Sequence, residues 1–524
     1  MVGVPDVHAI AWNPAQQIPK NQCIFRIQIV NCIDTWASTS QDQLGRVWLA
    51  WAEQPQGVVG ARADIYYRLW VNGVWGSKVQ VTSSSNITMH ETPSITSLSN
   101  GNMFVVWSAN GTGTSQLYYK LYSGLSSPPL PTSAEIRLTN GPLNDTQPSA
   151  VQDRNGRIWV VWNRSNEIFC KYFDTTAWSS EFSLPPASSP TDGHYDPTVI
   201  QRKDGRMMIA WAFVPSSTLN GNAHLYYTTT DGTLPILPST GIPAGAWTAA
   251  GQFFTDQTYS DEKPSIAQAR DGTLYAFWQR FTTILGVYWT SSADNGTTWT
   301  VPASLDNNSV DEFDVTAAQM SDKTIWLFWN KVGSTGIEMW STTSNAITNV
   351  HDVGLTSLSE SSYFIRSNDV VNVTVGVANF GDFAESTNLA VQLTTATTST
   401  VVKTMPLSLA IGQRLIVKFS WNSSQPFFGF WGRYNLTATL QPVPFESPIN
   451  QGDNSWSAGL VRISPLGDLD RNGKVDIGDA ARLAFAYGAT PSSPLWDPEA
   501  DIGHYGIINI ADAATLAFYY GDGV

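Results

Sequence analysis

The chain has 524 residues, of which 14% are charged and 12% aromatic, and its formal net charge is −14 at pH 7. This length predicts roughly two to four domains, and a composition rich in aromatic residues, Ser, Thr, Asn and Gly is typical of a β-rich extracellular protein. The acidic balance excludes a nucleic-acid partner, which needs a Lys/Arg footprint. No apolar run is long enough for a transmembrane helix.

The first residues, MVGVPDVHAIAWNP, lack the basic start and apolar core of a signal peptide. We expect that a leader was removed or that the chain has none, and that the protein is extracellular or lies at a cell surface. The three cysteines, Cys23, Cys32 and Cys170, are too few for a disulfide framework and match no metal-binding spacing. We expect buried thiols or at most one bridge.

Six segments of the chain align without a gap, starting at residues 37, 93, 148, 197, 264 and 315. In each, Ser or Thr holds the second place and Trp follows thirteen residues later, and five of them carry Gly at the ninth place. The pattern predicts two strands around a tight turn, followed by a third strand with adjacent aromatics and a fourth strand. Repeats of about 50–65 residues with four antiparallel strands build β-propellers. We therefore expect six blades over residues 20–347, with CIFRIQIV (23–30) closing the ring in the sixth blade.

The stretch SADNGTTW (292–299) lies between the third and fourth strands of the fifth repeat. Its Asp can accept hydrogen bonds from the turn backbone, its Gly permits an unusual dihedral, and its Trp can pack under the hairpin. The stretch resembles the Asp-box, or BNR repeat, of sialidase-like propellers. The resemblance implies a structural role for this turn and a ligand site at the opposite face, where the first strand of each blade begins.

The resemblance also implies where sialidase residues would stand. An Arg of the carboxylate-binding triad would lie two places before an aligned segment, and the nucleophilic Tyr one place before it. The first set of positions holds Thr35, Glu91, Thr146, Tyr195, Glu262 and Phe313, and the second holds Trp36, Thr92, Gln147, Asp196, Lys263 and Asp314. Neither required residue occurs at its place, and Arg26 of the stretch FRIQ is out of register, so we assign it to a strand edge. This argues against sialidase chemistry.

Acidic, aromatic and basic residues nevertheless gather at the expected ligand face. The candidate ligand-binding rim consists of Glu53, His90, Glu91, Asp145, Arg164, His194, Tyr195, Asp196, Glu262, Lys263, Arg280 and Asp314. Three interpretations are open: ordinary loop residues and strand caps, passive binding of a glycan or ion, or catalysis by converging carboxylates. Glycosidic cleavage by a general acid with a base or nucleophile would draw on Glu91, Asp196, Glu262 and Asp314.

The repeat ends near residue 347, and residues 350–463 show alternating strands without it, as in DVVNVTVGVANFGD (369–382). The alternation predicts one core-facing row, which consists of Val371, Val373, Val375 and Val377. This region resembles the CARDB module, an immunoglobulin-like sandwich of bacterial and archaeal cell-surface proteins. The resemblance implies a spacer or adhesive role.

The stretch GDLDRNGKVDIGDAARLAFAYG carries oxygen ligands at the spacing of a calcium loop, with Gly473 at the sixth place. The expected ligands are Asp468, Asp470, Asn472, the Lys474 carbonyl, Asp476 and Asp479. A second copy keeps Asp501, Asn509 and Asp512 but has Gly503 and Tyr505 where oxygens are expected, which predicts at most a weak second site. The pair resembles a dockerin, which implies a cohesin-like partner, docking onto the same chain, or self-assembly.

The sequence therefore predicts a mainly β protein with three modules: a six-bladed propeller at 1–347, an immunoglobulin-like sandwich at 350–463 and a small α-helical dockerin-like module at 466–524 that holds calcium. We expect a binding or structural protein that contacts a carbohydrate or surface glycan. The alternative is a polysaccharide hydrolase or lyase that uses the acidic rim.

Overall fold

The computed structural model describes most of the chain. The described residues are 10–19, 22–25, 28–55, 62–83, 89–110, 113–184, 192–216, 221–230, 247–255, 258–305, 310–333, 336–362, 364–366, 369–395, 398–422 and 432–523. The chain divides into two compact units, one of residues 1–350 with 447–449 and one of residues 351–446 with 450–524.

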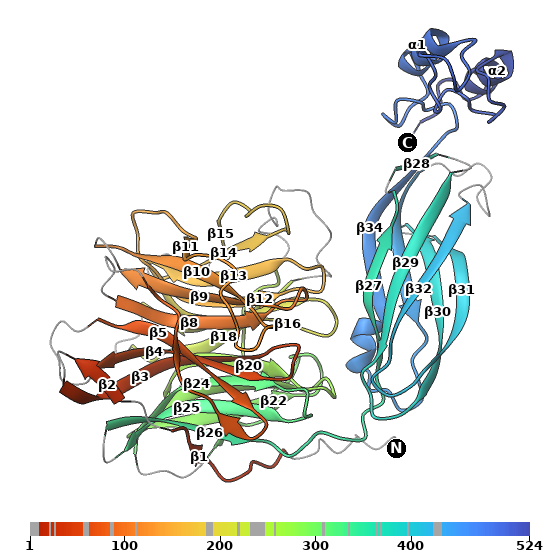
Figure 1. Ribbon diagram of the computed structural model, residues 1–524. Coiled ribbons are helices and arrows are strands. Elements are labelled where there is room, and N and C mark those ends of the chain that lie inside the picture. Colours follow the sequence, from red (N-terminus) through yellow and green to blue (C-terminus); the bar gives the residue numbers. More distant parts are fainter. Residues whose placement is uncertain are drawn as a thin grey trace. The chain divides into compact units, whose positions relative to one another are not determined.

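Six antiparallel sheets make up the first unit (Figure 1). Blade 1 contains β2 (Gln22–Phe25), β3 (Gln28–Gln41), β4 (Val47–Pro55), β5 (Asp64–Val71), β6 (Val74–Trp75) and β7 (Val79–Gln80). Blade 2 contains β8 (Met89–Ser97), β9 (Asn102–Asn110), β10 (Ser115–Ser123) and β11 (Ile136–Arg137). Blade 3 contains β12 (Asp145–Gln152), β13 (Ile158–Arg164), β14 (Glu167–Phe173) and β15 (Phe182–Ser183).

The remaining three sheets continue the series. Blade 4 contains β16 (Gly193–Gln201), β17 (Met207–Val214), β18 (His224–Thr229) and β19 (Gly251–Gln252). Blade 5 contains β20 (Ser260–Gln268), β21 (Leu274–Phe281), β22 (Leu285–Ser292) and β23 (Ala303–Ser304). Blade 6 contains β24 (Glu312–Gln319), β25 (Ile325–Gly333), β26 (Gly336–Thr343) and the N-terminal β1 (Gln16–Gln17).

Hydrophobic cores between neighbouring sheets close the blades into a ring. Five clusters each join one blade to the next along the chain, and a sixth joins blade 6 to blade 1 through side chains such as Phe328 and Leu49. The aligned tryptophans are buried in the sheets, at 0–2% exposure for Trp51, Trp107, Trp162, Trp211, Trp278 and Trp329. A closed ring of four-stranded meanders is a β-propeller, as the repeat predicts.

The strand that closes the ring is not the expected one. Gln16 and Gln17 of β1 pair with Ser341 and Trp340 of β26, and Trp12 continues the pairing at Ser344. Residues 23–30 instead fall in β2 and the start of β3, which pair with each other in blade 1. The prediction was wrong because β2 and β3 lie two residues apart, and so short a connection joins neighbouring strands of one sheet. Arg26 lies outside the described residues.

The second unit contains two sheets over one core. β27 (Val353–Glu360), β29 (Val370–Asn379) and β32 (Arg414–Asn422) form one, and the other runs in the order β28 (Phe364–Arg366), β34 (Ser455–Ser464), β33 (Gly432–Leu440), β30 (Glu385–Thr394) and β31 (Ser399–Leu409). A 3-10 helix, η2 (Asn450–Asn454), precedes β34. The alternating row from Val371 to Val377 lies in the shared core at 0–2% exposure, which confirms its predicted direction.

Two short helices, α1 (Ile477–Ala486) and α2 (Ile510–Phe518), follow the sandwich. Each begins with a capping box, formed by Asp476 with Asp479 in α1 and by Asn509 with Asp512 in α2. Within the described part of the chain, neither helix nor any other has the length and apolar character needed to span a membrane.

Candidate functional site

Every blade carries a β-bulge at the same place in its inner strand. The strand pairing shifts just before each aligned segment, for example between Glu262 and Ser265. The residue inside each bulge has a left-handed backbone, with φ between 49° and 56° for Trp36, Thr92, Gln147, Asp196, Lys263 and Asp314. Such conformations cost about 1–3 kcal/mol each in non-glycine residues and collect at functional sites.

These six residues, one from each blade, line a single cavity of about 120 Å³ together with the residue that follows each of them. We call them the axial ring, because a cavity shared by all six blades lies on the propeller axis. Each of them directly precedes an aligned segment. The repeat therefore places six side chains, one from each blade, around the same cavity.

One side of the axial ring is built from neutral hydrogen bonds around Asp196. The Gln147 side chain donates from Nε2 to Asp196 Oδ1 and accepts at Oε1 from the Asp196 backbone N–H at 3.2 Å. The Gln147 backbone N–H donates to Thr92 Oγ1 at 3.3 Å. Thr92, Gln147 and Asp196 thus form a chain of contacts across three neighbouring blades.

The other side is built around Asp314, which has three donors. Lys263 Nζ pairs with Oδ1, whereas Oδ2 accepts from Asn330 Nδ2 at 3.1 Å and from the Trp36 backbone N–H at 3.3 Å. The Lys263 ammonium also lies 5.8 Å from the centre of the Trp36 ring. Asp314 is therefore neutralised within the ring.

Asp196 and Lys263 of the axial ring both have shifted pKa values. Burial raises the pKa of Asp196 to about 6, with Lys263 opposing the rise and Glu262 and Asp314 adding to it. For Lys263 burial acts to lower the pKa, but Asp314 and Asp196 outweigh it and the pKa is raised. Lys263 therefore stays protonated, and the charge of Asp196 changes near neutral pH.

A second set of polar residues lies two places before the axial ring in each inner strand, and all six are at most 7% exposed. They are Asp34, His90, Asp145, His194, Asp261 and Glu312. The aligned Trp donates from Nε1 to this residue in blades 2, 3 and 5, at 2.9, 2.9 and 2.6 Å. In these three blades the position ties the first strand to the second.

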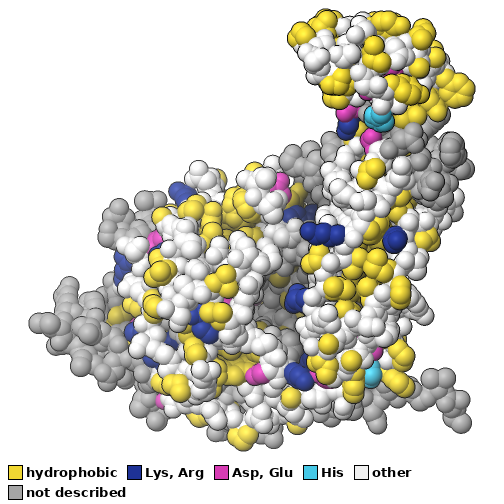
Figure 2. Space-filling model, turned by 45° about the vertical axis from the view of Figure 1, so that its right-hand side comes forward, with side chains coloured by type: hydrophobic (Ala, Val, Ile, Leu, Met, Phe, Trp, Pro, Cys, Tyr) yellow, Lys and Arg dark blue, Asp and Glu magenta, His cyan; other side chains and the backbone are white. Residues whose placement is uncertain are grey.

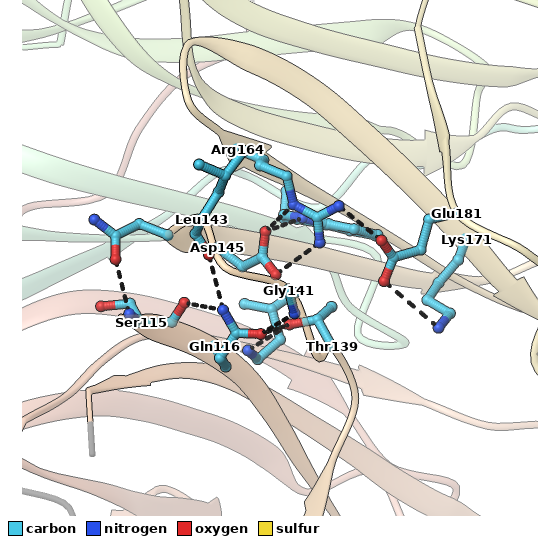
Figure 3. A network of polar contacts seen from close by, with 12 residues as sticks. Ser115, Gln116, Thr139, Gly141, Leu143, Asp145, Arg164, Lys171 and Glu181 are labelled. Atoms are coloured by element: carbon cyan, nitrogen blue, oxygen red, sulfur yellow. Dashed lines mark hydrogen bonds and ion pairs between the residues drawn. The ribbon is translucent and has the colours of Figure 1, made fainter. Parts of the chain in front are cut away.

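Several of these acids also hold a buried cation, as the network around Asp145 illustrates (Figure 3). Arg164 donates to Asp145 at 2.5 and 2.8 Å and to Glu181 at 2.7 Å, and Lys171 lies 3.9 Å from Glu181. Nearby, Gln116 donates to the Leu143 carbonyl at 2.8 Å. Corresponding pairs join Arg280 to Asp261 at 2.6 Å and Lys331 to Glu312 at 3.0 Å.

The structure thus divides the expected rim into two groups. Asp196, Lys263 and Asp314 line the axial cavity. The residues that lie within the sheets and do not line it are Glu53, His90, Asp145, Arg164, His194 and Arg280. Glu91, Tyr195 and Glu262 stand between the two groups and are half-buried. Of the four candidate catalytic carboxylates, Asp196 and Asp314 reach the cavity. Trp36, Thr92 and Gln147 also line the cavity, although the expected rim does not contain them, and they share the alignment column of the other three.

The Asp-box lies at the other end of blade 5. Ser292 pairs with Leu274 at the end of β22, whereas Glu262 pairs with Gln279 near the start of β20. Within the turn, Asp294 Oδ1 accepts from the Thr298 N–H at 2.8 Å, and the Trp299 ring packs 4.6 Å from Phe253 of blade 4. The turn therefore packs blade 5 against blade 4, which is the structural role that its resemblance to the Asp-box implies.

The first C-terminal loop brings carboxylate oxygens of Asp468, Asp470 and Asp479 within 4.8 Å of one another. Asp468 is fully buried, and its Oδ1 has no hydrogen-bond partner among the described residues, while Oδ2 accepts from the Gly473 N–H at 2.9 Å. Burial raises the pKa of Asp468, and the charges of Asp479 and Asp470 add to the rise. An orphaned buried carboxylate oxygen among further carboxylates fits a divalent cation.

The other expected ligands of this loop lie around that cluster. Asn472 and Lys474 are exposed in the loop, and Asp476 caps α1 by accepting from the Gly478 N–H at 2.8 Å. Gly473 has φ of 96°, the left-handed turn that the sixth place requires.

The second loop satisfies its carboxylates without an ion. Both oxygens of Asp501 accept backbone N–H groups, from Tyr505 and Gly506, at 2.9 Å. Asp512 accepts from the N–H groups of Gly503 and Asn509 at 2.9 and 2.8 Å. At this loop, backbone N–H groups thus give the carboxylate oxygens the partners that a cation would provide at the first loop.

Comparisons with known proteins identify no family: no family model matches the chain, and no curated protein matches it. Among solved structures, a protein of unknown function from Dyadobacter fermentans DSM 18053 matches with a TM-score of 0.50 and 10% identity, over 65% of this chain and 100% of that chain. This likeness is one of fold.

Two further structures match with lower scores. An α-L-arabinanase from Penicillium chrysogenum in complex with arabinobiose has a TM-score of 0.45 and 13% identity, over 59% of this chain and 92% of its own. A mutant of Trypanosoma rangeli sialidase that displays trans-sialidase activity has a TM-score of 0.46 and 8% identity, over 84% of this chain and 90% of its own.

Proposed function

We propose that the protein is an extracellular or cell-surface glycan-binding protein that holds its ligand at the axial ring and assembles through a calcium-loaded C-terminal module. The observation that carries the first part is the ring itself. Six non-glycine residues are held in a costly backbone conformation around one polar cavity, and an aromatic side chain, Trp36, stands among them. Sugars are bound by such combinations of an aromatic face and a few placed polar groups.

The pairing of Asp314 favours binding over hydrolysis. Glycosidic cleavage needs two carboxyl groups, one as acid and one as base or nucleophile. Both carboxylate oxygens of Asp314 already have partners, since Lys263 forms an ion pair with it and Asn330 and the Trp36 backbone N–H donate to it. Asp196 then remains as the one cavity carboxyl without a cationic partner at hydrogen-bonding distance.

One observation favours the alternative of a polysaccharide hydrolase or lyase. Burial raises the pKa of Asp196 to about 6, whereas Asp314 forms an ion pair with Lys263, and two carboxyl groups in such different environments are the pattern of acid/base catalysis. The two functions make opposite predictions for a glycan that binds. A binding protein leaves the glycan intact, whereas an enzyme cleaves it, and the Asp196→Asn variant of an enzyme would no longer release cleavage products.

A glycan array probed with the full chain tests the proposal. Binding that is lost on replacing Trp36 by alanine and kept in Phe281→Ala, an exposed aromatic outside the cavity, supports a lectin-like axis. Incubation of the bound glycan with the protein, followed by mass spectrometry, separates the two functions. Recovery of intact glycan supports binding, and shortened glycan supports the enzyme.

The second unit supports display and assembly. The sandwich of residues 350–463 fits a CARDB-like, immunoglobulin-like spacer, since its two sheets pack over one apolar core. The disulfide formed by Cys32 suits an oxidising compartment, whereas Cys170 is a buried free thiol.

The C-terminal module exposes the same apolar residues twice. Ile477, Phe485 and Tyr487 are 52–73% exposed, and residues 33 places further on repeat the pattern with 53–80% exposure at Ile510, Phe518 and Tyr520. Hydrophobic side chains accordingly crowd the surface of this module (Figure 2). Unpartnered apolar surface of this kind marks a protein interface, which fits a cohesin-like partner or a second copy.

Calcium would be held by Asp468, Asp470, Asn472, Lys474, Asp476 and Asp479, and it would neutralise carboxylates that otherwise repel one another. Binding to the folded form alone stabilises it by about 2.7 kcal/mol at a hundredfold excess over Kd. Hydrogen exchange of the full chain with and without chelator tests the site. We expect chelation to release protection across residues 480–487 and to leave the propeller protected, and unchanged protection there would contradict a calcium loop.

A further inference from the structure

We propose that the axial ring selects an amino sugar with a free, protonated amine over neutral and acidic sugars. This inference rests on the proposed function, since it names the ligand class of the same site. It follows from the charge of the cavity, from the state of one carboxylate and from the size of the space.

The cavity is acidic. Its lining contains three ionisable groups, Asp196, Asp314 and Lys263, so two negative charges face one positive charge and the net charge is −1. Glu262 lies close enough to raise the pKa of Asp196. No arginine is among the described residues that line the cavity. A sugar carboxylate would meet unbalanced like charge in a partly desolvated space, which excludes uronic and sialic acids as ligands.

Asp196 has no cation at hydrogen-bonding distance, although Lys263 lowers its pKa from farther away. The cation of the ring, Lys263, forms its ion pair with Asp314, and the side chain that hydrogen-bonds Asp196 is the neutral amide of Gln147. An ammonium placed against Asp196 would supply a charge-assisted hydrogen bond and remove the cost of the desolvated negative charge. The ring already shows how an ammonium is held, since Lys263 lies between a carboxylate and the Trp36 ring.

The size of the cavity sets how much ligand enters. Its volume of about 120 Å³ is well below the roughly 300–1,000 Å³ of pockets that enclose drug-sized molecules. The space therefore accommodates the end of a chain, and the amine must lie on the terminal sugar.

The test compares matched sugars on the full chain by isothermal titration calorimetry. The probes are glucosamine, galactosamine and mannosamine, each beside its N-acetyl form, with glucuronic and galacturonic acid. We expect at least one amine to bind about tenfold or more tighter than its N-acetyl form, which is the effect of one charge-assisted hydrogen bond. We expect the acids not to bind.

Asp196→Asn removes the charge with little change in shape. Asn tolerates positive φ and still accepts from Gln147, and the variant should bind the amine no better than the N-acetyl form. Asp322→Asn changes the net charge equally at an exposed turn and should keep the preference.

Two outcomes overturn the inference. One is an N-acetyl sugar or an acid that binds as tightly as every amine, and the other is an amine preference that survives in Asp196→Asn. In either case glycan binding itself remains, and the proposed function stands. Failure of every sugar in the panel and of the glycan array would overturn both proposals.

Discussion

The buried acids that tie the strands together give the sharpest test of how this propeller is held. Arg164 bonds two carboxylates that differ in burial (Figure 3). The Asp145 side chain is fully buried and also accepts from Trp162 at 2.9 Å, whereas the Glu181 side chain is 29% exposed. If burial determines how much an ion pair stabilises the fold, Asp145→Ala must lower the free energy of unfolding far more than Glu181→Ala.

The magnitudes follow from the two environments. Removing one partner of a buried pair costs about 3–5 kcal/mol, because the other charge is left uncompensated. Arg164 would keep Glu181, so we expect the lower end, about 3 kcal/mol, for Asp145→Ala. Loss of a partly exposed pair costs about 0–1 kcal/mol, and we expect this for Glu181→Ala.

Urea unfolding followed by tryptophan fluorescence measures both free energies. The double variant Asp145→Ala with Arg164→Met is a further check. It removes the buried guanidinium that Asp145→Ala leaves uncompensated, while Glu181 keeps Lys171 at 3.9 Å, so it should be more stable than Asp145→Ala alone. Equal losses for the two alanine variants would refute the reasoning. So would a loss below about 1 kcal/mol in Asp145→Ala together with weakened glycan binding, because Asp145 would then be a ligand residue.

Three further perturbations have defined outcomes. Burial, with repulsion by Glu53, raises the pKa of Asp34 to about 7. The protonated carboxyl therefore makes its whole contribution to stability below about pH 4, and this contribution is lost as the pH rises to about 7. Asp34→Asn should therefore raise the melting temperature at pH 8 and leave it unchanged at pH 4; equal shifts at both would contradict this. Deleting residues 1–19 removes the ring-closing β1, and calorimetry should find no cooperative propeller transition, whereas normal melting would disprove the closure. Gly473→Ala places a Cβ 1.4 Å from the Arg462 guanidinium, whereas Gly506→Ala meets nothing within 4 Å; calcium titration should show weaker binding in the first variant than in the second, and equal affinities would count against the loop geometry.

The repeat made the propeller predictable because each blade must bury a Trp at one place and turn at another. The same alignment column delivers the axial ring, so its members could be found from their position alone. The closing strand could not, since Gln16 and Gln17 form a two-residue strand without any alternation to detect.

The buried acids were misplaced for a different reason. A carboxylate shortly before Pro commonly lies in a loop, and the partners of Asp145, which are Trp162 and Arg164, come from the next strand. Their spacing of 17 and 19 residues recurs at Asp261. This regular spacing is that of residues facing each other across two paired strands, and it would have indicated a structural role for these acids.

The central claim is that the axial ring is a binding site rather than a catalytic one. A crystal structure of the full chain soaked with the glycan that binds on the array tests it most directly. We expect an intact glycan whose terminal sugar lies in the cavity against Trp36 and Asp196. A sugar bound elsewhere on the molecule, or a cleaved one at the axis, would contradict it.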